Sequence, residues 1–210
     1  VKTALDNVTT NVMIADNERN IIYMNTSVTE MLTNAEADVR KVLPNFSVSR
    51  ILGSNIDQFH KNPSHQRSLL AGFTSTHRAQ IQVGVRTFTL IANPIINGQG
   101  ERLGSVVEWN DRTAEVAAEH DINAMVEAAS AGELSKRISL EGKTGFNYDL
   151  AANINSMLDA ITTPLNVVAD YLKRIANGDM PPRITDDYKG EFLTLRKNMN
   201  ATIGILNGFV

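Results

Sequence analysis

The chain contains no cysteine, only one tryptophan and few aromatic residues of any kind. Without cysteine, disulfides, thiolate metal sites, iron–sulfur clusters and thioether-linked haem are all excluded. The absence is compatible with a reducing compartment. No apolar run approaches the roughly 20 residues of a membrane-spanning helix, and no secretory signal is visible. The net charge of −3 argues against a nucleic-acid partner, which would require a basic face.

The motifs of the common enzyme classes are also missing. There is no GxSxG nucleophile elbow, and the segment GVRTFTL (84–90) fits a hairpin better than a phosphate-binding loop. His60 and His65 would lie about 140° apart around a helix, and Pro63 interrupts any helix between them. A zinc site shared by these two histidines is therefore not expected. We predict a protein without enzymatic activity.

The first half of the chain has the pattern of a mixed α+β domain. The segment 26–43 predicts one or two short helices that end at Pro44, and HQRSLLAGF (65–73) predicts a further helix turn. Short β-rich runs separated by turn residues predict five strands, over 11–16, 20–25, 76–83, 86–95 and 103–110. This order of elements predicts an antiparallel five-stranded sheet with helices on one side.

The second half has no strand signal and contains an internal repeat. AGELSKRI (131–138) matches NGDMPPRI (177–184), and LAANINSMLDAI (150–161) matches LRKNMNATIGIL (195–206). Each unit therefore predicts a helix, a glycine-marked turn, an extended connector and a second helix. The chain ends in a helical pattern without a capping signal and starts at Val1, so we expect a fragment of a longer protein.

The second helix of each unit carries apolar residues at the spacing of a coiled-coil seam. The seam positions are Leu150, Ile154, Met157 and Ile161, and in the second unit Leu195, Met199, Thr202 and Leu206. One helix cannot bury such a seam alone, which predicts parallel four-helix bundles in a homodimer. Because Thr202 places a polar residue in the seam of the second unit, we predict that the second bundle packs more weakly.

Pro164 lies between the two repeat units and leaves two interpretations open. It either breaks the chain into independent units or kinks a nearly continuous helix. The apolar series that continues through Leu165, Val168 and Leu172 favours the kinked helix.

The segment NIDQFHKNPSHQ (55–66) contains two of the four histidines. It is polar, irregular and too short to pack as core, and it is expected to cross the open side of the sheet. The residues alone favour a loop histidine at His60 that makes a local hydrogen bond. A histidine that binds a ligand between helix and strands remains open.

Trp109 lies on the last predicted strand, and its indole N–H needs an acceptor if it is buried. The residues alone favour a core tryptophan bonded to a backbone carbonyl, and a bound ligand as the acceptor remains open. The predicted inward face consists of Leu103, Ser105, Val107 and Trp109, with Phe88, Leu90 and Ala92 on the neighbouring strand.

Three segments, 5–25, 56–70 and 104–113, resemble the PAS domains of bacterial methyl-accepting chemotaxis receptors of the aerotaxis type. The repeated AxGEL…RI…NxM pattern is similar to HAMP domains in tandem, which form all-α parallel coiled-coil bundles. The resemblance implies a PAS sensor domain over 1–113, a first HAMP domain over 114–163 and a second over 164–210.

Within that family, the haem-binding PAS domains imply haem b as cofactor and oxygen or another diatomic gas as ligand. By resemblance, His60 is the axial iron ligand, Trp109 the distal donor and Leu90 its apolar neighbour. The resemblance then implies a lesser role for His65, either at the start of the following helix or in contact with a haem propionate. The alternative is a PAS–HAMP adaptor whose pocket holds another small molecule or nothing and which acts through dimerisation.

The last predicted strand ends in DRT, which resembles the junction through which PAS domains pass a signal to a following helix. The resemblance implies a relay from Trp109 through Asp111 and Thr113 to the first HAMP helix near residues 122–129. It also implies a cytoplasmic homodimer that controls a chemotaxis histidine kinase and its coupling protein through a module beyond residue 210.

Overall fold

The computed structural model describes residues 2–60, 62–64, 67 and 74–208. These residues form two compact units, residues 1–117 and residues 118–210. The helix turn predicted over 65–73 lies outside the described residues, apart from Arg67.

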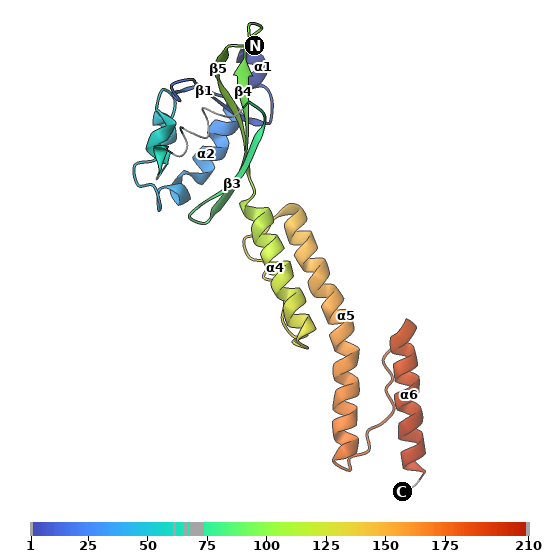
Figure 1. Cartoon of the computed structure of the whole chain (residues 1–210). Helices are drawn as coiled ribbons and strands as arrows, with labels where there is room; N and C mark the ends of the chain where they lie inside the picture. Colours follow the sequence, from blue (N-terminus) through green and yellow to red (C-terminus); the bar gives the residue numbers. More distant parts are fainter. Residues whose placement is uncertain (1, 61, 65–66, 68–73, 209–210) are drawn as a thin grey trace. The chain divides into compact units, whose positions relative to one another are not determined.

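The first unit is one antiparallel sheet with helices against one face (Figure 1). Within the described residues, the segment that the sequence predicted as one or two helices up to Pro44 forms one α-helix, α2 (Thr26–Val39). The strand order of the sheet is β2-β1-β5-β4-β3, which places the first strand beside the last. The strands are β1 (Asn11–Asp16), β2 (Ile21–Met24), β3 (His77–Val83), β4 (Arg86–Ile96) and β5 (Arg102–Asp111). A short helix, α1 (Lys2–Asp6), precedes them, and two 3-10 turns, η1 (Val48–Arg50) and η2 (Ile56–Phe59), follow α2.

The core of this unit lies between α2 and the sheet. Four buried residues of α2 recur at helical spacing, which gives the helix one apolar face. They pack with buried residues of β1, β2 and β4 into one cluster. The cluster includes Val28, Leu32, Ala35, Val39, Met13, Ile21 and Phe88.

Asn25 is a fully buried polar residue that begins α2 and binds four backbone groups. Its Oδ1 accepts from Val12 N and from Val28 N, each at 3.0 Å. Its Nδ2 donates to the carbonyls of Leu5 at 3.0 Å and Thr10 at 2.8 Å. One amide thus joins the segment before β1, β1 itself and the start of α2.

The inward face predicted for β5 is right except at Leu103, which is 52% exposed. The ladder between β4 and β5 shifts register between Ile95 and Ile96, so that Ile95 faces Gly104 and Ile96 faces Arg102. Leu103 is the extra residue of this irregularity. Because one extra residue reverses the side-chain alternation, Arg102 takes the inward direction that a regular strand gives to Leu103.

The second unit contains most of α4 (Thr113–Ser130) together with α5 (Gly145–Ala176) and α6 (Gly190–Asn207). Lys143 Nζ, just before α5, lies 2.6 Å from Asp121 in the middle of α4. Arg137 Nη2, early in the connector, lies 2.6 Å from Asp159 farther along α5. The connector therefore runs back beside the helices, and α4 and α5 are parallel, as the sequence predicted.

Each connector is fixed to the following helix by an asparagine amide. Ile138 N donates to Asn155 Oδ1 at 2.8 Å, and Asn155 Nδ2 donates to Ile138 O at 2.9 Å. Ile184 and Asn200 make the same pair of bonds, at 2.7 and 3.0 Å. Both isoleucines are buried. The repeat seen in the sequence is therefore a repeat of structure.

The residues buried within the second unit differ in part from the predicted seam. Ala151, Leu158 and Ile203 pack inside the unit, whereas Met157 is 55% exposed and Thr202 is exposed. The dimer seam itself stays a prediction. α5 continues through Pro164, which confirms the nearly continuous helix. Within the described ranges, no helix is both long and apolar enough to cross a membrane.

Candidate ligand-binding site

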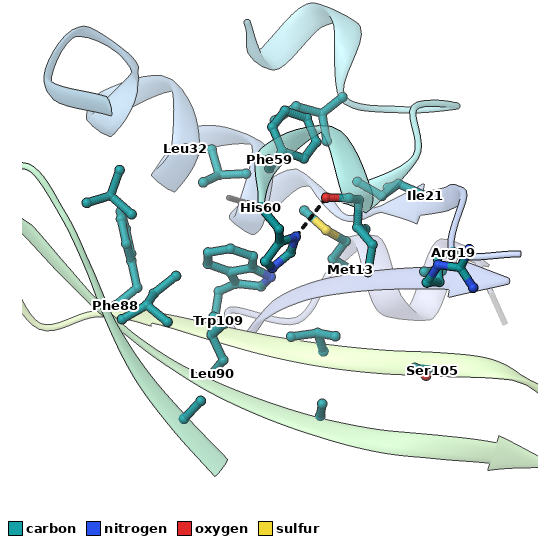
Figure 2. A pocket seen from close by; sticks show the side chains of 18 of the residues that line it. Met13, Arg19, Ile21, Leu32, Phe59, His60, Phe88, Leu90, Ser105 and Trp109 are labelled. Carbon is teal, nitrogen blue, oxygen red and sulfur yellow. Dashed lines mark hydrogen bonds between the residues drawn. The ribbon is translucent and has the colours of Figure 1, made fainter. Parts of the chain in front are cut away.

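A cavity of about 640 Å³ opens between the sheet and the helical layer of the first unit (Figure 2). This volume is within the range of cofactor and small-molecule sites. Most of its wall is apolar and comes from β1, α2, η2, β4 and β5. His60, Leu90 and Trp109, which the sequence analysis selected from separate segments, all line it.

His60 follows the last residue of η2, and its ring orientation is set by the backbone of that turn. Its Nδ1 lies 2.8 Å from Ile56 O. A carbonyl oxygen can only accept, so Nδ1 carries a proton, and in the neutral imidazole Nε2 then holds the lone pair. A histidine that donates through one nitrogen to a carbonyl is the usual arrangement for a metal ligand. The expected local hydrogen bond is thus present, and it prepares the other nitrogen for binding.

Trp109 has a buried Nε1 for which the described residues provide no hydrogen-bond partner. The sequence-based preference for a core tryptophan bonded to a backbone carbonyl is therefore wrong within the described structure. Its ring packs edge-on against Phe88, with centroids 5.8 Å apart. A buried N–H without a partner costs about 1–3 kcal/mol. An acceptor supplied by a bound molecule would remove that cost.

One end of the cavity is polar, which was not predicted from the sequence. Arg19 in the turn after β1 and Arg102 on β5 line this end, together with Asp16 and Ser105. Ser105 was expected to face inward, but Arg102 reaches the cavity only through the register shift beside Leu103. No short motif in the sequence marks these residues as a group.

The junction between β5 and α4 is held by Asp111 and Thr113. Thr113 N donates to Asp111 Oδ1 at 3.0 Å, and the Thr113 hydroxyl donates to the same oxygen. Thr113 Oγ1 also accepts from Thr87 N of β4 at 3.0 Å. The two residues selected as the relay are therefore in direct contact at the first residue of α4.

Arg86 extends this junction to α2. Its Nη1 lies 3.0 Å from Asp111 Oδ2, and its Nε lies 2.8 Å from Asp38 Oδ2. Hydrogen bonds from Lys41 and then from Arg86 hold the pKa of Asp38 below its usual value. The end of α2, β4 and the start of α4 are thereby joined through charged side chains.

The fold and two domain models define this chain as one that combines a PAS domain with HAMP sequence. A PAS domain model matches residues 1–62, and a HAMP domain model matches residues 142–208. The chain is 51% identical, over 96% of its length, to the methyl-accepting chemotaxis protein McpB of Pseudomonas aeruginosa. It spans 30% of the length of that receptor. The predicted resemblance to PAS and HAMP domains and the predicted fold class are confirmed.

Solved structures with similarity to the chain include two other bacterial PAS proteins. The Aer2 receptor of Vibrio cholerae, described as a dual PAS-haem oxygen sensor, is 34% identical, and the match covers 49% of this chain and 93% of that one (TM-score 0.45). The PAS domain of BvgS from Bordetella pertussis is 16% identical, with 59% and 93% covered (TM-score 0.40).

Proposed function

We propose that the PAS cavity binds haem b and senses oxygen or another diatomic gas. His60 Nε2 would hold the iron of the haem, and the Trp109 N–H would donate a hydrogen bond to the bound gas. The observation that supports this most directly is the pairing, in one apolar cavity, of an imidazole Nε2 and an indole N–H for which the described residues provide no hydrogen-bond partner. The Vibrio cholerae receptor is a haem oxygen sensor, and we extend that chemistry to this chain on its own residues.

The residues present fit the group. Haem iron takes one axial ligand from the protein and offers the opposite position to a small molecule. His60 supplies a neutral imidazole, and Leu90, Val107 and Phe88 supply an apolar wall that limits the entry of water. An absorption spectrum of the purified chain, reduced and then exposed to oxygen, tests the proposal. A colourless protein that takes up no added haem would instead support the PAS–HAMP adaptor.

Replacing Trp109 by phenylalanine should keep the haem Soret band and speed the dissociation of oxygen. Phenylalanine retains a flat ring against Phe88 but removes the donor, and one hydrogen bond contributes about 1 kcal/mol. We therefore expect roughly threefold to tenfold faster dissociation in stopped-flow measurements. Leu103→Ala, outside the cavity, is the control and should match the unmodified protein. Equal rates for the phenylalanine variant would remove Trp109 from the donor role.

We further propose that the signal leaves the PAS domain through Trp109, β5, Asp111 and Thr113. Trp109 is two residues from Asp111 on the same strand, and Asp111 holds the first residue of α4. A change at the indole therefore has a short covalent and hydrogen-bonded path to the first HAMP helix. By similarity to chemoreceptors, the HAMP units would act in a cytoplasmic homodimer and control a histidine kinase with its coupling protein.

Asp111→Asn should leave gas affinity unchanged but remove the gas-dependent change of hydrogen exchange in α4. The substitution weakens both the ion pair with Arg86 and the hold on Thr113, and we expect roughly two- to fivefold faster exchange at the start of the helix. Asp38→Asn is the matched control, because it breaks the other ion pair of Arg86 without touching α4. A full gas response in the Asp111 variant would place the relay elsewhere.

A further inference from the structure

The lining of the PAS cavity carries an excess of positive charge. Three arginines, Arg19, Arg67 and Arg102, line it together with one aspartate, Asp16. A second aspartate, Asp57, pairs with both Arg19 and Arg67, which leaves an excess of one positive charge. The chain as a whole carries a net charge of −3. A cationic lining in an acidic protein indicates that the occupant of the cavity bears negative charge.

Arg19 has an unusual backbone conformation. Its φ of 71° is the only positive value at a non-glycine residue in the described part of the chain. The conformation is fixed by Arg19 N, which donates to Asp16 O at 3.0 Å, and by Arg19 O, which accepts from Ile56 N at 3.0 Å. Glycine adopts this conformation at less cost than any other residue. An arginine in a strained turn beside a cavity points to a use for its side chain.

Asp57 positions the Arg19 guanidinium but does not use all of its N–H donors. The distances from Arg19 Nε to the two carboxylate oxygens are 3.3 and 3.4 Å, and Nη2 is 3.4 Å from the second. Charge-assisted bonds of this kind are usually 2.7–2.9 Å long. Asp57 is also shared with Arg67, whose Nε lies 3.0 Å away. A guanidinium has five N–H donors, so Arg19 can bind Asp57 and a second carboxylate together.

A second guanidinium lies at the same end of the cavity. Asp16, just before the turn that holds Arg19, pairs with Gly104 of β5. Arg102 lies two residues before Gly104, and its Nη2 donates to Ser105 Oγ at 2.9 Å. Figure 2 shows Arg19 and Ser105 at the end of the cavity away from Phe88. The cavity thus has a cationic end and an apolar end.

We infer that the cationic end binds the carboxylate groups of an otherwise apolar ligand, with Arg19 as the main contact and Asp57 as its positioning residue. The inference rests on the proposed function, in which the ligand is haem and the carboxylates are its two propionates. It adds a second anchor, independent of iron, to the one that His60 provides.

Binding of haem and of haem dimethyl ester, whose carboxylates are blocked, tests the inference. The single Trp109 lies in the cavity, so quenching of its fluorescence reports occupancy by either probe. The unmodified chain should bind haem at least tenfold more tightly than the ester. Arg19→Gly should reduce that preference below threefold by weakening haem binding alone. Arg78→Ala, an exposed arginine outside the cavity lining, removes the same charge and should preserve the preference.

Thermal unfolding separates recognition from folding. Glycine suits the positive φ of position 19, so Arg19→Gly should not lower the melting temperature while it weakens haem binding. Equal affinity of the unmodified chain for the two probes would overturn the inference and leave the haem proposal standing. Equal weakening of both probes by Arg19→Gly would also overturn it, because that pattern marks a structural role. Failure of both probes to bind the unmodified chain would overturn the haem proposal as well.

Discussion

His60→Ala is expected to abolish the Soret band of the haem-loaded protein. The imidazole is the proposed protein bond to the iron, and its Nε2 is available because Nδ1 is held by Ile56 O. Loss of a neighbour that merely orients a metal ligand costs about 10–100-fold in affinity. Removal of the ligand itself should therefore weaken haem binding by more than about a hundredfold. Absorbance titration of the purified chain with haem measures the change.

Two controls make this experiment specific. His77→Ala removes another histidine that lines the cavity, and it should retain the Soret band. Free imidazole added to the His60 variant should restore binding, because a small ligand can occupy the space that the side chain vacates. An unchanged spectrum in His60→Ala, or loss of the band in His77→Ala, would show that the iron is held by a different residue.

Asn25→Ala is expected to produce the largest loss of stability in the PAS domain. The substitution leaves the N–H groups of Val12 and Val28 and the carbonyls of Leu5 and Thr10 without their side-chain partner. Each buried polar group without a partner costs about 1–3 kcal/mol, and entry of water offsets part of the sum. We expect the free energy of unfolding to fall by about 3–5 kcal/mol.

Urea unfolding followed by Trp109 fluorescence measures this loss. The only tryptophan of the chain lies in the first unit, so the signal reports the PAS domain and not the helical unit. Asn17→Ala is the matched control, because this exposed asparagine makes one bond, to Arg102 O, and should cost less than about 1 kcal/mol. A loss below that value in the Asn25 variant would mean that the four backbone groups find other partners.

Local patterns predicted the elements of the fold well because they depend on residues near one another in the chain. β-rich runs separated by turn residues identified the five strands, and helical spacing identified a helical segment that begins at the start of α2. The inward direction predicted for the Leu103 side chain was wrong, because one extra residue in the β4–β5 ladder reverses the alternation of side chains beyond it. The four bonds of Asn25 join three segments, and nothing in the local sequence of Asn25 indicates them.

The site was predictable only in part. His60 and Trp109 were unusual residues, and the family resemblance implied that they share one pocket; in the structure both line the same cavity. The residues alone presented a local hydrogen bond and ligand binding as alternatives for His60. The geometry shows that they are compatible, since the bond to Ile56 is what leaves Nε2 free. Arg19 was missed because its role depends on a turn conformation and on Asp57, 38 residues away.

The amide pairs of Asn155 and Asn200 have a consequence for how the helical unit can be repeated along a chain. Each amide binds the main chain of a connector, so it places no demand on which side chain stands at that position. When a unit of this kind is duplicated along a chain, the connector of each copy can therefore bind its following helix through the same two hydrogen bonds. The remaining positions are then free to diverge, and successive copies can acquire different mechanical preferences while sharing one architecture.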